Sequence, residues 1–114
     1  MHTPTLSTPD PATDAALMGR MARRDATALV ELRQRHFGSL YAQVYGILMD
    51  AKRAERVVEE VFEQVWYRAA WMSERRTGAL GWLRDLARVL AHADRAAGPL
   101  QTAVAARQYL KEAS

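Results

Sequence analysis

The side chains that could perform catalysis are few and scattered in this chain of 114 residues. His2, His36 and His92 lie far apart, and no His-Glu-x-x-His pair, glycine-rich phosphate loop or nucleophile elbow occurs. A carboxylate-bridged metal pair in a helical bundle would need Glu-x-x-His motifs on two helices, and neither is present. The absence of cysteine excludes disulfides and thiolate metal sites. The sequence therefore predicts a protein that is not an enzyme and that needs no metal or cofactor.

The most conspicuous chemical pattern is instead the charge on the segment 54–66. Its apolar residues recur at spacings of three and four, which predicts one helix with its apolar face at the centre of the core. The remaining face carries five charged side chains, four of them acidic: Glu55, Arg56, Glu59, Glu60 and Glu63. Folding does not require so acidic a face, so we interpret it as a candidate binding surface.

Positive charge is concentrated in the last third of the chain, where residues 73–114 carry seven basic and four acidic residues. Arg84, Arg88 and Arg95 recur at steps of four and seven, which places them on one outward helix face. Such a face favours an anionic partner, although solubility alone would also explain it. Trp71 and Trp82 flank a polar segment, where each would either stack on an unpaired base or clamp the loop hydrophobically.

The elements that position these residues are all expected to be helices. Asp14, Asp25 and Asp50 are predicted N-caps of helices that end near Arg24, Leu48 and Trp71. A further helix is expected from about Thr77 to Ala96, where Gly98 and Pro99 end it. Residues 101–112 are predicted to form a weak last helix that Val104 and Leu110 anchor.

No segment alternates apolar and polar residues as a strand would. The sequence therefore predicts an all-α fold, a compact bundle of four helices plus a weak fifth. We expect a flexible N-terminal lead over residues 1–13, a helical domain over 14–97, and a C-terminal tail or short helix over 98–114. No membrane span or signal peptide is recognisable, so a cytoplasmic protein without membrane contact is expected.

The order of several sequence blocks resembles region 2 of the extracytoplasmic-function (ECF) group of bacterial sigma factors. The resemblance covers residues 14–96. The blocks that carry it are Arg35-His36-Phe37, Leu40-Tyr41, Ala54-Glu55, Val57-Val58-Glu59-Glu60-Val61-Phe62, Trp66 and Gly81-Trp82-Leu83-Arg84-Asp85-Leu86-Ala87-Arg88. Each block is short, but this order and spacing together are typical of that family.

The resemblance implies a transcription initiation factor with the compact helical fold of sigma region 2. It implies that the helix at 54–66 docks on the clamp helices of the beta-prime subunit of core RNA polymerase. It also implies that residues 72–96 recognise the minus-ten promoter element and hold the single-stranded non-template strand. The residues expected to contact that DNA are Arg75, Arg76, Trp82, Arg84, Arg88 and Arg95.

Three positions depart from the family pattern. Arg56 and Glu59 stand where the family usually has Asp and Gln, and Val89 stands at an Asn position. The chain also contains no second helix-turn-helix domain, the family's region 4. Three hypotheses therefore remain: a region 2 module that binds polymerase and promoter DNA, a diverged sigma-like regulator that acts through protein contacts such as an anti-sigma factor, or an unrelated helical interaction module.

Overall fold

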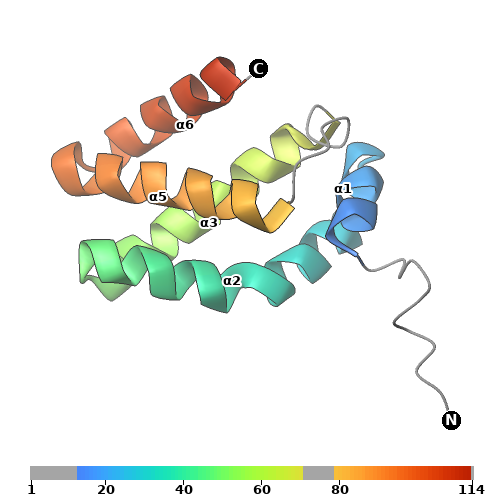
Figure 1. Ribbon diagram of the computed structural model, residues 1–114, viewed down its shortest axis with the longest axis horizontal. Coiled ribbons are helices and arrows are strands. Elements are labelled where there is room, and N and C mark those ends of the chain that lie inside the picture. The colour runs from blue at the N-terminus through green and yellow to red at the C-terminus, as the bar shows by residue number, and fades with distance from the viewer. Residues whose placement is uncertain (1–12, 71–78, 114) are drawn as a thin grey trace, which may run out of the picture.

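The computed structural model describes residues 13–70 and 79–113, and within these ranges it contains five helices and no strand (Figure 1). The prediction of an all-α bundle is confirmed. The five helices are α1 (Asp14–Ala22), α2 (Ala26–Leu48), α3 (Ala51–Tyr67), α5 (Ala79–Ala97) and α6 (Pro99–Ala113). The predicted lead at 1–13 falls almost wholly outside the described residues, and so does the polar segment near Trp71.

Side-chain caps fix where the first three helices begin. The prediction is confirmed for Asp25, whose carboxylate accepts a hydrogen bond from the amide of Thr27, and for Asp50, which accepts one from the amide of Arg53. It is wrong for Asp14. The cap of α1 is Thr13, whose hydroxyl accepts a hydrogen bond from the amide of Ala16 at 3.1 Å.

Asp14 is the first residue of α1, and its carboxylate is used for a contact between helices. Both of its oxygens lie within 3.0 Å of Nε2 of the buried His36 on α2, and Arg35 donates to it as well. A negative side chain in the first helical turn is favourable because it faces the positive end of the helix dipole. Asp14 therefore ties α1 to the middle of α2.

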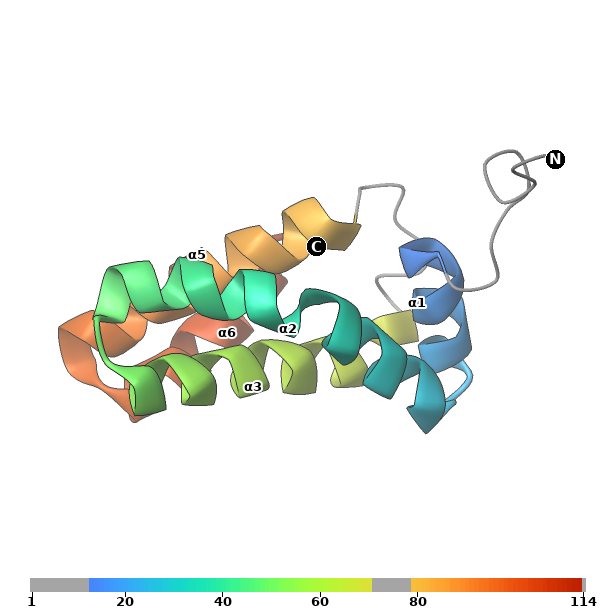
Figure 2. The ribbon, with the colours of Figure 1, turned by 90° about the horizontal axis from the view of Figure 1, so that it is seen from below.

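The helices pack against one another in a simple arrangement. α2 and α3 lie side by side, joined by the short turn at Met49 and Asp50, and α5 packs against both of them (Figure 2). α6 packs on α5 and only slightly on α3, while α1 closes one end of α2 (Figure 1). Met49 ends α2 in the left-handed conformation, with a φ of 54°, which is uncommon for a residue other than glycine.

The apolar face of α3 is the centre of the core, as its spacing predicted. Its buried side chains are Ala54, Val57, Val58, Val61, Phe62 and Val65. α1, α2 and α5 supply the other large fully buried residues, among them Leu17, Met21, Leu32, Leu40, Leu83, Leu86 and Leu90. Trp66 is half-buried rather than central: the guanidinium of Arg24 lies over its ring at 3.8 Å from the centroid.

The last helix is better anchored than the sequence indicated. Leu110 is buried, as predicted, but the prediction for Val104 is wrong because its side chain is 44% exposed. Thr102 and Ala106 face α5 instead. Together with Leu110 they recur every four residues and form the buried face of α6. Alanine and threonine gave a weak signal in the sequence because small side chains mark a helix interface less clearly than leucine does.

Candidate functional site

The charged face of α3 is less uniform in the structure than in the sequence. Glu59 forms an ion pair with Arg33 of α2, and this hydrogen bond raises the pKa of the Arg33 guanidinium. Glu60 accepts a hydrogen bond from Gln64 at 2.6 Å. Glu55 and Glu63 are exposed. The acidic surface that α3 presents to a partner is therefore centred on Glu55 and Glu63.

Arg56 is directed toward α5. One of its guanidinium nitrogens lies 3.6 Å from Oδ2 of Asp94, and the Arg56 side chain is 49% exposed. Arg53 contacts the same carboxylate more closely, with Nε donating to Oδ1 at 2.7 Å and Nη2 donating to the Asp94 carbonyl at 2.7 Å. The hydroxyl of Thr102 on α6 donates to Oδ2 at 3.2 Å.

Asp94 is the buried centre of this cluster, with only 1% of its side chain exposed. A carboxylate removed from water is costly unless charged or hydrogen-bonding partners compensate it. Arg53, Arg56 and Thr102 provide that compensation from α3 and α6. Sequence reasoning missed the cluster, although one signal was present: Asp94 follows Leu83, Leu86 and Leu90 on the apolar stripe of α5.

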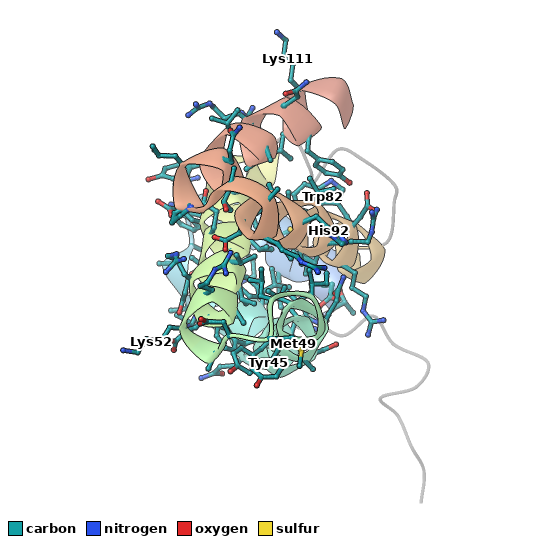
Figure 3. The ribbon with its side chains drawn as sticks, turned by 90° about the vertical axis from the view of Figure 1, so that its left-hand side faces the viewer. Tyr45, Met49, Lys52, Trp82, His92 and Lys111 are labelled. Carbon is teal, nitrogen blue, oxygen red and sulfur yellow. The ribbon has the colours of Figure 1, made fainter. Side chains whose placement is uncertain are left out.

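A shallow groove of about 320 Å³ lies between α2 and α3. It is lined by Phe37, Gly38, Tyr41, Ala51, Lys52 and Glu55. Tyr45 continues the aromatic row on α2, with its ring 6.0 Å from that of Tyr41. Figure 3 shows Tyr45, Met49 and Lys52 at the same end of the molecule. Glu55, although exposed, therefore also lines a partly apolar groove.

The arginines of α5 differ in whether their guanidinium groups have partners within the protein. Arg84 lies at the contact with α2, where its guanidinium donates to the hydroxyl of Ser39 at 3.1 Å and its carbonyl accepts from Gln43 at 2.9 Å. Arg88 forms an ion pair with Asp85 one turn earlier. Arg95 is exposed near the end of the helix. The other two expected DNA contacts, Arg75 and Arg76, lie outside the described residues.

Trp82 is half-buried between α5 and α6. Its ring lies 6.4 Å from that of Tyr109, with the two planes tilted by 57°. The indole nitrogen is buried, and no acceptor among the described residues reaches it. Figure 3 shows Trp82 and His92 on α5, the helix that α6 covers. Trp82 therefore packs on the last helix, a contact that the sequence did not indicate.

The hydroxyl of Tyr109 donates a hydrogen bond to Asp85, which also pairs with Arg88. Partial burial, together with this hydrogen bond, raises the pKa of Tyr109 to about 12. The same hydrogen bond, followed by the contact with Arg88, lowers the pKa of Asp85. The three side chains form a second polar cluster, on the side of α5 that faces α6.

Residues 13–70 and 79–113 contain no group of three or more histidine and acidic side chains placed to hold a metal ion. In the same two ranges, no helix is both long enough and apolar enough to cross a membrane.

Comparison with known proteins adds one relative. The chain is 32% identical over 72 residues to the ECF RNA polymerase sigma factor SigK of Mycolicibacterium vanbaalenii. The match covers 63% of this chain but 37% of that protein, so the chain spans little more than a third of its relative's length. The chain is sigma-factor-like in sequence. No protein-family model and no solved structure matches it.

Replacing Arg53 should destabilise the fold, because it would leave the buried Asp94 with only the longer contact to Arg56 and the hydrogen bond from Thr102. For Arg53→Met we expect a loss of about 2–3 kcal/mol in the free energy of unfolding, below the usual cost of breaking a buried pair because Arg53 is partly exposed. Urea denaturation measures this loss. Arg107→Met, on an exposed position of α6, is the control and should stay within about 0.5 kcal/mol. Equal effects of the two changes would contradict the role of Asp94.

The raised pKa of Tyr109 predicts how the contribution of its phenol to folding stability changes at alkaline pH. A folded-state pKa of about 12, above the unfolded value of about 10, favours folding while the phenol stays neutral. That contribution is complete below pH 10 and is lost as the pH rises through 12. The difference in tyrosinate absorbance between the wild type and Tyr109→Phe should therefore titrate near pH 12. A difference that titrates near pH 10 would show that the phenol does not bond to Asp85.

Proposed function

We propose that this chain acts in transcription initiation as a module like sigma region 2, which binds core RNA polymerase through α3 and promoter DNA through residues 72–96. The observation that carries the proposal is the similarity to an ECF sigma factor over 72 residues. The all-α fold is consistent with it. The whole relative is much longer than this chain, so the proposal concerns this module alone.

The polymerase-binding part of the proposal rests on the acidic surface of α3. Complementary charge speeds and orients the docking of two proteins, so a basic partner surface suits Glu55 and Glu63. Arg56 does not oppose such docking as strongly as its charge suggests, because Asp94 lies 3.6 Å from its guanidinium. We infer that Glu59 and Glu60 contribute less, since each already has a partner within the protein.

The DNA-binding part rests on the arginines of α5. Arginine and lysine side chains near phosphates release counterions, which makes binding strong at low salt and weak at high salt. Arg84, Arg88 and Arg95 of α5 are all exposed, but Arg84 and Arg88 have contacts within the protein, and none is found for Arg95 among the described residues. We infer that Arg95 provides phosphate contact and that Arg84 also positions α5 on α2.

Charge reversal at Glu63 tests polymerase binding. Glu63→Lys should weaken binding to core polymerase about tenfold, because a complementary charge becomes a repulsive one. Binding is measured with immobilised core enzyme. The double variant Gln34→Lys and Gln101→Lys changes the net charge equally at exposed positions outside α3, so it controls for charge alone. Equal binding by the two variants would exclude docking through this surface.

Arg56→Asp is a less clean test of the same surface, although it would restore the residue typical of the family. It would place a second carboxylate beside the buried Asp94 and remove one of its partners. A change in polymerase binding would then combine a surface effect with a loss of stability.

Arg95→Gln tests the contact with DNA. If Arg95 neutralises one phosphate of single-stranded DNA, the slope of log affinity against log salt should fall in magnitude by about 0.7. The loss of affinity should also be similar for promoter and non-promoter sequences, since phosphates carry no sequence information. Fluorescence anisotropy over a salt series measures the slope. Arg107→Gln is the control, and an equal slope for both variants would rule out a specific role for Arg95.

A diverged regulator that acts through protein contacts is the second candidate function. Two observations favour it: Arg88 is paired with Asp85, and Trp82 packs against Tyr109. Such a protein would bind polymerase or an anti-sigma factor without sequence preference on DNA. Polymerase binding that depends on Glu63, together with equal affinity for promoter and random single strands, would support this function over the first.

A further inference from the structure

We propose that α6 is an intramolecular cover that competes with single-stranded nucleic acid for Trp82 on α5. This inference rests on the proposed function, in that it takes α5 to be the nucleic-acid-binding helix. It adds a mode of regulation within the same chain: the site is occupied by α6 until a strand displaces that helix.

The ring of Tyr109 occupies the place beside Trp82 that an unstacked base would take. The two ring centroids are 6.4 Å apart, within the range of aromatic contacts in proteins. Bases in single strands stack on exposed aromatic side chains with little dependence on sequence, in a parallel arrangement rather than the tilted one of Tyr109. Tyr109 and a base cannot occupy this position together.

One polar group at this contact has no partner. The buried indole nitrogen of Trp82 has no acceptor among the described residues, and an oxygen of the strand at the edge of the ring would provide one once α6 has moved. Among the described residues, the one direct polar bond from Tyr109 to α5 is the bond that its hydroxyl donates to Asp85. A strand that displaced α6 would therefore break this bond and the one from Thr102 to Asp94, and it could supply one to Trp82.

α6 is attached to the rest of the protein through one main neighbour. It packs closely on α5, through Thr102, Ala106, Tyr109 and Leu110, with only a slight contact to α3. Because its contacts are almost confined to α5, α6 can open locally while the core around α3 stays folded, and local opening costs less free energy than global unfolding.

The junction between α5 and α6 can act as the hinge. Gly98 joins the two helices with a φ of 91°, in the left-handed region that glycine adopts readily. Rotation at this residue would move α6 away from α5 without a change within either helix.

Tyr109→Ala tests the cover in the full chain, because it removes both the ring beside Trp82 and the bond to Asp85. Its affinity for a fluorescein-labelled, mixed-sequence single-stranded DNA should be about tenfold higher than that of the wild type, the usual magnitude of one stacking contact. Val104→Ala changes an exposed position of the same helix and should leave the affinity unchanged. Tyr109→Phe keeps the ring and should give an intermediate increase.

Fluorine NMR on protein labelled with fluorotryptophan reports the opening itself, with the resonance of residue 82 assigned from Trp82→Phe. DNA should shift this resonance in the wild type toward its position in Tyr109→Ala. A resonance that moves in Tyr109→Ala without any gain in DNA affinity would overturn the competition. An unmoved resonance would show that α6 does not cover Trp82 in solution.

The two proposals fail in different ways. If the wild type and Tyr109→Ala both bind no DNA, the proposed DNA-binding function is wrong and the cover has no ligand to exclude. If the wild type binds DNA and Tyr109→Ala binds it equally, the function stands and the cover is wrong. Should Tyr109→Ala lose its helical circular dichroism, Tyr109→Phe alone decides: equal affinity with the wild type would overturn the cover.

Discussion

The buried carboxylate of Asp94 constrains how three helices of the described chain pack together. It lies on α5, yet its partners come from α3 and α6, so these helices must keep their register for the charge to remain compensated. Apolar packing alone would tolerate small sliding of one helix past another. The hydrogen bonds and ion pairs of Asp94 do not tolerate such sliding. They therefore fix the position of α3, with its exposed charged face, relative to α5.

Internal ion pairs decide which charges remain available at the surface. Arg33 engages Glu59 and Asp94 engages Arg56, so the exposed charge of α3 is concentrated on fewer side chains than its sequence implies. On α5, Asp85 similarly engages Arg88. A surface whose charges are already paired interacts more weakly with an external charge, because binding must compete with an existing partner.

The fold was predictable because helical spacing and capping residues are local signals. The apolar stripe of α3 and the caps Asp25 and Asp50 needed no knowledge of the rest of the chain. What could not be predicted involves partners distant in sequence: Asp94 with Arg53, and Tyr109 with Trp82. Asp14 shows the same limit, since a carboxylate that suits an N-cap was instead used for His36 on another helix.

The peripheral position of α6 has a consequence for how the protein unfolds. Because α6 packs mainly on α5, opening of α6 would break that contact and the bond from Thr102 to Asp94, while the packing of α3 on α2 would stay in place. In that case α6 would be a separate cooperative unit whose amide hydrogens exchange at a rate set by local opening. A single unfolding free energy would describe the helices around α3 but not this unit, since two-state behaviour holds only where all parts melt together.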